Sequence, residues 1–149
     1  MNPSEPIHWY DHYRGGGRLS LRTHVALAGG ESQLDRWSIR DLIDWGGVTY
    51  IQFDATRSGG VTAFLQMSAY ASMHGVQVVP HHEPQIHGHL ILGIDNGFGV
   101  ESFPNPKRDP LWDTLYTQRP ELRDGHLHLD DHPGFGCAIN WDTVAQYRI

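Results

Sequence analysis

The sequence predicts an α/β fold in which parallel strands alternate with helices. Four apolar runs of about strand length recur along the chain, at residues 24–28, 48–53, 76–79 and 100–103, and helix-length segments separate the first three. Polar residues that can do chemistry accompany the ends of these runs: Glu31, Asp54, His81 and Glu101. Because parallel strands need a long crossover between them, this order indicates strand–helix units with active groups at the carboxyl ends of the strands.

The first two units are the clearest. Residues 6–18 contain Pro6 and three consecutive glycines, so we expect a loop there, and residues 19–23 finish a short helix. Ser32 is expected to cap the helix that follows it, and this helix is expected to end at Gly46 and Gly47. The β-branched and aromatic run 48–53 predicts a strand, and residues 54–60 form the loop after it.

The next units lead into a different kind of segment. Residues 61–74 are the best helix of the chain, residues 86–94 predict a short apolar helix, and 100–103 predicts the last core strand. Beyond it three prolines mark a loop, and residues 111–116 predict a helix of one or two turns. Asp124-Gly125 predicts a tight turn before a strand at 126–129, and Asn140 or Asp142 caps a final helix.

Composition restricts the function. A chain of 149 residues fits one domain, spanning 1–149, and its net charge of −6 without a basic run argues against nucleic acid as a partner. No apolar stretch approaches the ~20 residues of a membrane span, and we expect no signal peptide. Cys137 is the one cysteine and cannot form an internal disulfide, so we expect a reducing, cytoplasmic location. We interpret Cys137 as a small packing residue rather than a nucleophile.

The polar residues that accompany the strands also belong to motifs that resemble a known family. The motifs are Gly30-Glu31, Asp54 with Gly59-Gly60-Val61-Thr62, His74-Gly75 with His81, His89-Leu90, Val100-Glu101, and Asp124-Gly125 with Pro133-Gly134-Phe135-Gly136. In this order and spacing they are similar to the C-terminal half of enolase-superfamily enzymes, in the mandelate racemase subgroup. The resemblance covers nearly the whole chain.

The resemblance implies a partial (β/α) TIM-type barrel of about four parallel strand–helix units and a C-terminal tail. It implies abstraction of the α-proton of a carboxylate substrate with an essential Mg²⁺. In that mapping Glu31 resembles a metal ligand, Asp54 and His81 resemble the Asp–His dyad with His81 as base, and Glu101 resembles the acid that hydrogen-bonds the enediolate.

The sequence departs from the family pattern at its start. The Lys-x-Lys strand that carries the opposite base, one Asp ligand and the N-terminal capping domain are absent from these residues. The position of a further ligand aligns with Ser4, and Glu5 is the candidate substitute. We therefore expect a homo-oligomer or association with a chain that supplies the N-terminal half.

The residues themselves allow plainer readings. A histidine suits a base because its pKa lies near neutrality, and a neighbouring carboxylate would orient it. The alternative for His81 is a histidine at a strand end that binds only backbone. Asp54 and Glu31 are alternatively helix-start acids, and Glu101 alternatively pairs with Lys107 or Arg108. Arg57 contacts either a substrate carboxylate or solvent.

Three functions remain open on this basis. An acid-sugar dehydratase, a hydro-lyase, is favoured because dehydration needs only one well-placed base. A racemase or epimerase of 2-hydroxy acids is the alternative, and so is a fragment that is catalytically inert on its own. A zinc-binding module is a weaker candidate despite eleven histidines, because His126 and His128 share a strand face without an evident third ligand.

Overall fold

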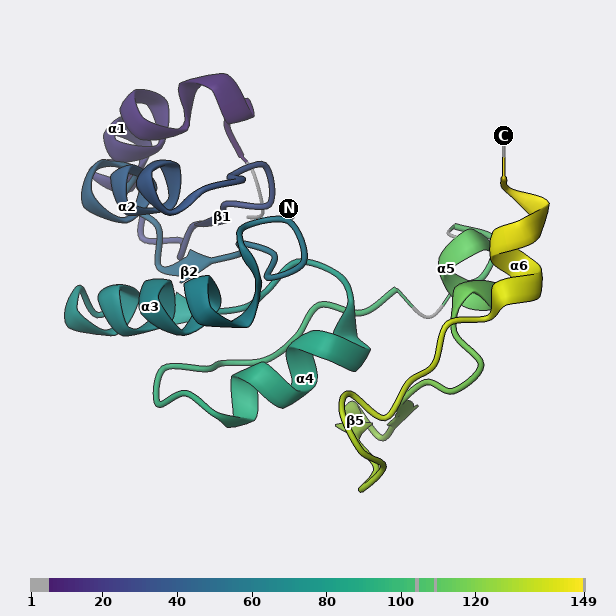
Figure 1. The fold of residues 1–149 in the computed structure, drawn as a ribbon. Helices are drawn as coiled ribbons and strands as arrows, with labels where there is room; N and C mark the ends of the chain where they lie inside the picture. The colour runs from purple at the N-terminus through teal and green to yellow at the C-terminus, as the bar shows by residue number, and fades with distance from the viewer. Residues whose placement is uncertain (1–5, 104, 109, 149) are drawn as a thin grey trace.

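A parallel three-stranded sheet with alternating helices forms the first two-thirds of the molecule (Figure 1). The computed structural model describes residues 6–103, 105–108 and 110–148. The strands β1 (Ala28–Gly29), β2 (Tyr50–Ile51) and β3 (Gln77–Val78) lie in the order β1-β2-β3. Each is followed by a helix: α2 (Arg36–Trp45), α3 (Gly60–Met73) and α4 (Pro84–Leu92). The predicted α/β class is confirmed.

The core lies between this sheet and its helices. The rings of Phe53 and Phe64 meet at 5.1 Å between centroids, which ties the end of β2 to α3. The other buried apolar side chains come from α2, α3, α4 and the strands: Ile39, Leu42, Ile43, Ile51, Ala55, Met67, Ala71, Val76, Val78 and Leu90. One residue of each strand is buried, Gly29, Ile51 and Val78, whereas Ala28, Tyr50 and Gln77 are only partly buried.

The fourth predicted strand is wrong in position. Residues 100–103 form no strand in the part of the chain that the structure describes, and the place beside β3 is taken by Gly97, which bridges to Val78. Asn96 fixes this segment because its side-chain amide donates to the carbonyls of Ser68 and Val76, at 3.1 and 2.9 Å. Gly97 permits the close approach, since a Cβ there would lie 2.7 Å from the carbonyl oxygen of Ile91.

The N-terminal segment was predicted as a loop and is instead helical. It forms a 3₁₀ turn, η1 (Trp9–Asp11), a π-helix, η2 (His12–Gly16), and one short α-helical turn, α1 (Gly17–Ser20). A Cβ at Gly16 would lie 2.7 Å from the carbonyl oxygen of Gly46, so the glycines let this segment pack directly on the end of α2. Tertiary contact therefore overrides the low helix propensity of glycine.

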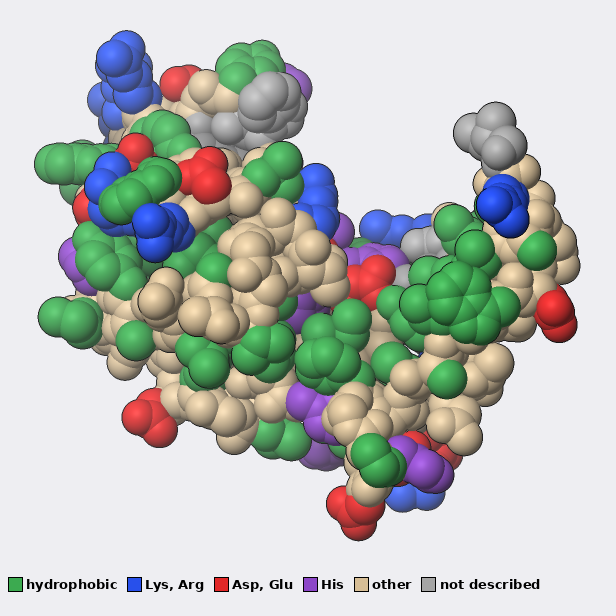
Figure 2. Space-filling view, viewed as in Figure 1, with side chains coloured by type: hydrophobic (Ala, Val, Ile, Leu, Met, Phe, Trp, Pro, Cys, Tyr) green, Lys and Arg blue, Asp and Glu red, His purple; other side chains and the backbone are tan. Residues whose placement is uncertain are grey.

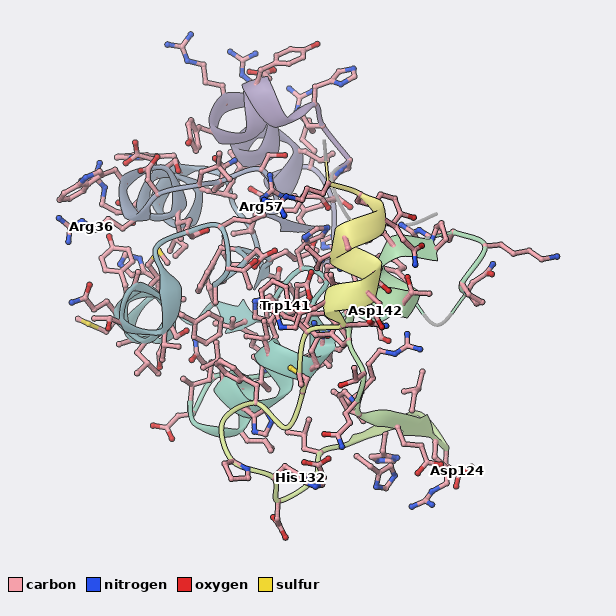
Figure 3. The ribbon with its side chains drawn as sticks, turned by 45° about the vertical axis from the view of Figure 1, so that its right-hand side comes forward. Arg36, Arg57, Asp124, His132, Trp141 and Asp142 are labelled. Atoms are coloured by element: carbon pink, nitrogen blue, oxygen red, sulfur yellow. The ribbon has the colours of Figure 1, made fainter. Side chains whose placement is uncertain are left out.

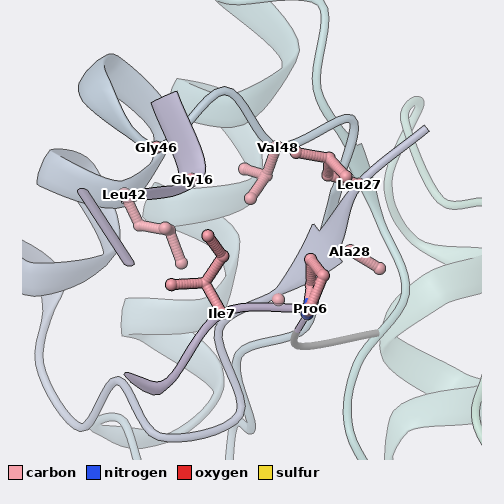
Figure 4. A pocket seen from close by; sticks show the side chains of 9 residues that line it. Pro6, Ile7, Gly16, Leu27, Ala28, Leu42, Gly46 and Val48 are labelled. Carbon is pink, nitrogen blue, oxygen red and sulfur yellow. The ribbon is translucent and has the colours of Figure 1, made fainter. Parts of the chain in front are cut away.

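A small apolar cavity marks the seam between this N-terminal segment and the sheet (Figure 4). Ile7 and Gly16 line it on one side, and Leu27, Leu42 and Val48 line it on the other. The seam is thus closed by aliphatic side chains.

The cap of α2 differs from the prediction. The side chain of Asp35, rather than that of Ser32, accepts hydrogen bonds from the backbone amides of Trp37 and Ser38, at 2.8 and 3.0 Å. These bonds lower the pKa of the Asp35 carboxyl, and the bond from the Ser38 amide has the largest effect. Helix α2 consequently begins at Arg36, and Gly46 ends it as expected.

The C-terminal segment stands apart from the sheet and carries its own small elements (Figure 1). Helix α5 (Pro110–Leu115) precedes an antiparallel hairpin of β4 (Glu121–Arg123) and β5 (His126–His128), and α6 (Trp141–Gln146) closes the chain. The predicted turn is confirmed: Asp124, at the hairpin tip in Figure 3, and Gly125 both have positive φ, 53° and 76°. The Asn140 cap of α6 is also confirmed, by bonds from the amides of Asp142 and Thr143.

A visible hollow separates the C-terminal segment from the sheet and its helices in Figure 2. Below the hollow the two parts are joined at α4, where a Cβ on Gly88 would lie 3.0 Å from the side chain of Leu129. Within the described ranges, no helix has the length and apolar character needed to span a bilayer.

Replacing the observed cap tests this description of α2. Asp35→Ala is expected to lower the free energy of unfolding by about 1 kcal/mol, because two helix-start amides lose their acceptor. Ser32→Ala is the matched control and should change stability by a few tenths of a kcal/mol at most. Urea denaturation followed by circular dichroism measures both, and equal losses in the two variants would contradict the assignment of the cap.

Candidate active site

The carboxyl ends of the three strands meet at one edge of the sheet. Strand pairing aligns Gly29 with Ile51 and Ile51 with Val78, so residues a few positions later emerge together. Glu31 follows β1, Asp54 follows β2 and His81 follows β3 at this edge. The amide of Glu101 donates to the carbonyl of Pro80 at 3.4 Å, which brings the fourth predicted residue beside His81.

Asp54 is a buried carboxylate with many neighbours. Only 3% of the residue is exposed, and its Oδ1 accepts from the backbone amide and the hydroxyl of Thr56, at 2.8 and 2.7 Å. Burial raises the pKa of the Asp54 carboxyl, but interactions with His81 and Thr56 outweigh it and hold the pKa well below its usual range. Asp54 is therefore ionised at neutral pH and presents its second oxygen to His81.

His81 faces this free oxygen. Its Nδ1 lies 3.7 Å from Oδ2 of Asp54, and that nitrogen is buried without a hydrogen-bond partner. The distance is longer than a hydrogen bond, as is common for catalytic pairs in the absence of substrate. Asp54 raises the pKa of His81 most strongly, burial opposes the increase, and the charges of Glu31 and Glu101 add to it.

Glu101 is held by the backbone that follows His81. Its Oε2 accepts the amide N–H of His82 at 3.2 Å, and His82 has a positive φ of 52°. Arg108, one of the two cations predicted as an alternative partner, lies instead over the ring of Phe103, with 3.5 Å to its centroid. The carboxylate of Glu101 is thus directed to the His81–His82 turn.

Of the four polar residues predicted at the strand ends, Glu31 is the one whose side chain has the fewest described contacts. Its backbone carbonyl accepts from the guanidinium of Arg57 at 3.2 Å, so Arg57, labelled in Figure 3, links the loops that follow β1 and β2. Glu5, the other predicted metal ligand, lies outside the described residues. Among residues 6–103, 105–108 and 110–148, no group of three His, Cys, Asp or Glu side chains is arranged to hold a metal ion.

One buried histidine escaped the sequence reasoning. His87, on α4, has no exposed surface, and its Nε2 lies 3.3 Å from Oδ1 of Asp54. His87 was assigned no role from the sequence. On the same helix the ring of His89 contacts the carbonyl of Phe135 at 3.2 Å. The signal that points to His87 is a titratable ring between two apolar helix positions, Ile86 and Leu90, that face the core.

Comparisons with known proteins agree on one family. The family model described as enolase C-terminal domain-like matches residues 4–143. L-rhamnonate dehydratase of Saccharopolyspora erythraea is 31% identical over 136 residues, covering 87% of this chain and 35% of that enzyme. L-talarate/galactarate dehydratase of Salmonella typhimurium is 29% identical over 138 residues, covering 91% of this chain and 32% of that enzyme.

Solved structures give the same result. A mandelate racemase/muconate lactonizing enzyme from a marine actinobacterium, in complex with magnesium, is 36% identical with a TM-score of 0.85, covering 98% of this chain and 41% of that chain. L-talarate dehydratase from Polaromonas sp. JS666, complexed with Mg and L-glucarate, is 30% identical with a TM-score of 0.82, covering 95% and 38%. The chain spans about a third of the length of the curated relatives it matches.

The electrostatic coupling of His81 to Asp54 can be measured directly. The raised pKa of His81 is expected to fall in Asp54→Asn, because the variant removes the opposite charge that favours the imidazolium. Histidine NMR titration measures the change, with the His81 signal identified by its loss in His81→Asn. Asp130→Asn, which removes the partner of exposed His132 at 3.0 Å, should leave the His81 titration unchanged.

The same pair predicts a pH dependence of stability. The raised pKa of His81 means that its contribution is complete below about pH 6.5 and is lost as pH rises through the folded-state pKa. The lowered pKa of Asp54 means that its contribution is complete above about pH 4 and is lost as pH falls. The destabilisation caused by His81→Asn should therefore be largest between about pH 4 and 6.5 in urea denaturation. A pH-independent difference would contradict the pairing.

Proposed function

The chain belongs to the enolase C-terminal domain-like family, and on that premise we propose that it forms part of a Mg²⁺-dependent acid-sugar dehydratase. The observation that carries the proposal is the Asp54–His81 pair, at 3.7 Å, at the carboxyl edge of a parallel sheet with Glu101 beside it. Relatives named as dehydratases of rhamnonate, talarate and galactarate support this reaction over racemisation. Dehydration also needs only one base, and the described edge offers His81.

The proposed reaction begins with His81. Neutral His81 would take the α-proton of the substrate, and the C–H electron pair would pass into the adjacent carboxylate to give an enediolate. The electrons would then return to break the C–O bond at the β-carbon. The leaving hydroxyl would take the proton from His81 and depart as water, and the remaining enol would tautomerise to a 2-keto acid. The base is regenerated, and atoms and charge balance.

The neighbouring carboxyl groups would assist His81 in different ways. Asp54 would orient the imidazole and stabilise the imidazolium that forms on proton transfer. It remains ionised, because its pKa is held low by its polar neighbours. Glu101 would hydrogen-bond the substrate oxygen that gains negative charge, which is the electrostatic stabilisation this reaction needs most.

The metal is the part of the site that the described residues do not complete. Mg²⁺ prefers near-octahedral oxygen coordination, and Glu31 is one carboxylate at this edge without two further ligands around it. We propose that Glu31 is one ligand and that the others come from residues outside the described ranges. When bound, Mg²⁺ would supply positive charge beside the substrate carboxylate.

The open sheet supports a proposal about assembly. Strand β1 has one hydrogen-bonded neighbour in the described sheet, whereas a closed barrel of this type uses about eight strands. An unpaired parallel strand next to an apolar core tends to pair with another chain. We propose that the functional barrel contains further strands, supplied by the rest of the polypeptide, by a separate chain or by a second copy.

Activity with and without the base tests the function. With Mg²⁺ and the further strands that complete the barrel, the chain is expected to form 2-keto acids from a panel including L-rhamnonate, L-talarate and galactarate. His81→Asn should lower kcat by about 10²–10⁴-fold, because the proton-transfer group is lost. His128→Asn, an exposed histidine on β5, is the control and should keep the wild-type rate. Absence of both turnover and Mg²⁺ binding in the wild type would favour the inert fragment.

Sedimentation velocity tests the assembly. The chain of 16.8 kDa is expected to sediment as a dimer or larger species, or to form a stable complex with a chain that carries the N-terminal half of a relative. Burial of the β1 edge provides the driving force. A compact monomer that stays folded and gains no partner would overturn the proposal.

A further inference from the structure

The geometry points to a positioning role for His87: we infer that its buried ring clamps the two loops that carry Asp54 and His81. The ring contacts the residue that follows each of them, and through His82 it also acts on Glu101. This inference rests on the proposed function, because it assigns a purpose to the spacing of the dyad. It concerns a side chain that no proton-transfer step above uses.

The first contact of His87 holds the loop after β2. Its Nε2 accepts the backbone N–H of Ala55 at 3.0 Å, and both groups are buried. Ala55 is the residue directly after Asp54, so this bond fixes the peptide from which the carboxylate projects. The adjacent Thr56 amide and hydroxyl already bind Oδ1, which leaves Oδ2 directed to His81.

The second contact holds the loop after β3. Nδ1 of the same ring donates to the backbone carbonyl of His82 at 2.7 Å. Since Nδ1 donates and Nε2 accepts, the partners assign His87 to the neutral tautomer with its proton on Nδ1. The 3.3 Å contact between Nε2 and Oδ1 of Asp54 is then a close approach of two acceptors, not an ion pair.

The clamp extends to a third member of the site. His82 has φ of 52° and Glu83 has φ of 47°, a left-handed conformation that is costly for residues other than glycine. The His82 peptide unit is held on both sides, because its carbonyl binds His87 and its N–H binds Glu101. The ring of His87 thereby retains the backbone shape that directs an N–H to the Glu101 carboxylate.

The position of His87 suits a fixed strut better than a reacting group. Its ring has no exposed surface and lies near Phe64 of the core, at 6.2 Å between ring centroids, on the first turns of α4. A side chain without access to solvent or substrate cannot exchange protons with either during turnover. Its two ring nitrogens point in different directions within the plane of a rigid ring, and each binds one of the two loops.

The test uses the full chain and reads the geometry rather than turnover. His87→Phe keeps an aromatic ring at this position and removes both hydrogen bonds. His87→Asn is a milder change and is measured instead if His87→Phe does not fold. Either folded variant is expected to lower the raised pKa of His81, measured by histidine NMR titration, because Asp54 is no longer held opposite the imidazole. Hydrogen exchange at the Ala55 amide should become at least about tenfold faster, because the amide loses its buried acceptor.

His89→Phe is the matched control on the same helix. It removes the contact of His89 with the carbonyl of Phe135 and should leave both the His81 titration and the Ala55 exchange rate unchanged. A folded His87 variant with wild-type titration of His81 would overturn the inference, and so would equal changes in the His89 control. Failure of the dehydratase assay leaves these NMR outcomes unaffected, so the two proposals fail separately.

Discussion

The parallel pairing of β1, β2 and β3 is the constraint on which the rest of the molecule depends. It places three strand ends at one edge, and the right-handed crossovers between successive strands place the connecting helices α2 and α3 on one face of the sheet. Each strand is only two residues long by its hydrogen-bond ladder, so the loops that follow begin immediately beside the core. Side chains on these loops therefore enter a partly buried space, which is where charge interactions are strong.

Burial of Asp54 is the most demanding consequence. A carboxylate removed from water costs several kcal/mol unless hydrogen bonds or opposite charge replace its hydration. The chain meets this with donors from its own turn, through Thr56, and with the ring of His81 opposite Oδ2. The result is an ionised acid beside a histidine of raised pKa, an arrangement that suits the proton abstraction proposed for His81.

The C-terminal segment is connected to this site through the start of α4. Tyr116 donates from its hydroxyl to the carboxylate of Glu83 at 3.3 Å, and the side-chain amide of Gln85 also binds that carboxylate. Burial first, and then the charge of Glu83, raises the pKa of Tyr116. Helix α4 therefore receives contacts both from the site and from the C-terminal segment.

The sequence by itself determined the α/β class and the order of the strand–helix units, because both follow from apolar periodicity. It also determined the hairpin at Asp124–Gly125, which follows from turn chemistry within a short stretch. The order of the units in turn indicated that the polar residues near the strand ends converge: Glu31, Asp54, His81 and Glu101. Only the tertiary structure decided the helical N-terminus, the replacement of residues 100–103 by Gly97 beside β3, and the burial of His87 against Asp54. Each of these depends on contacts between residues far apart in sequence, where glycine permits close approach or a ring spans two loops. Such contacts outweigh the local preferences that a sequence displays.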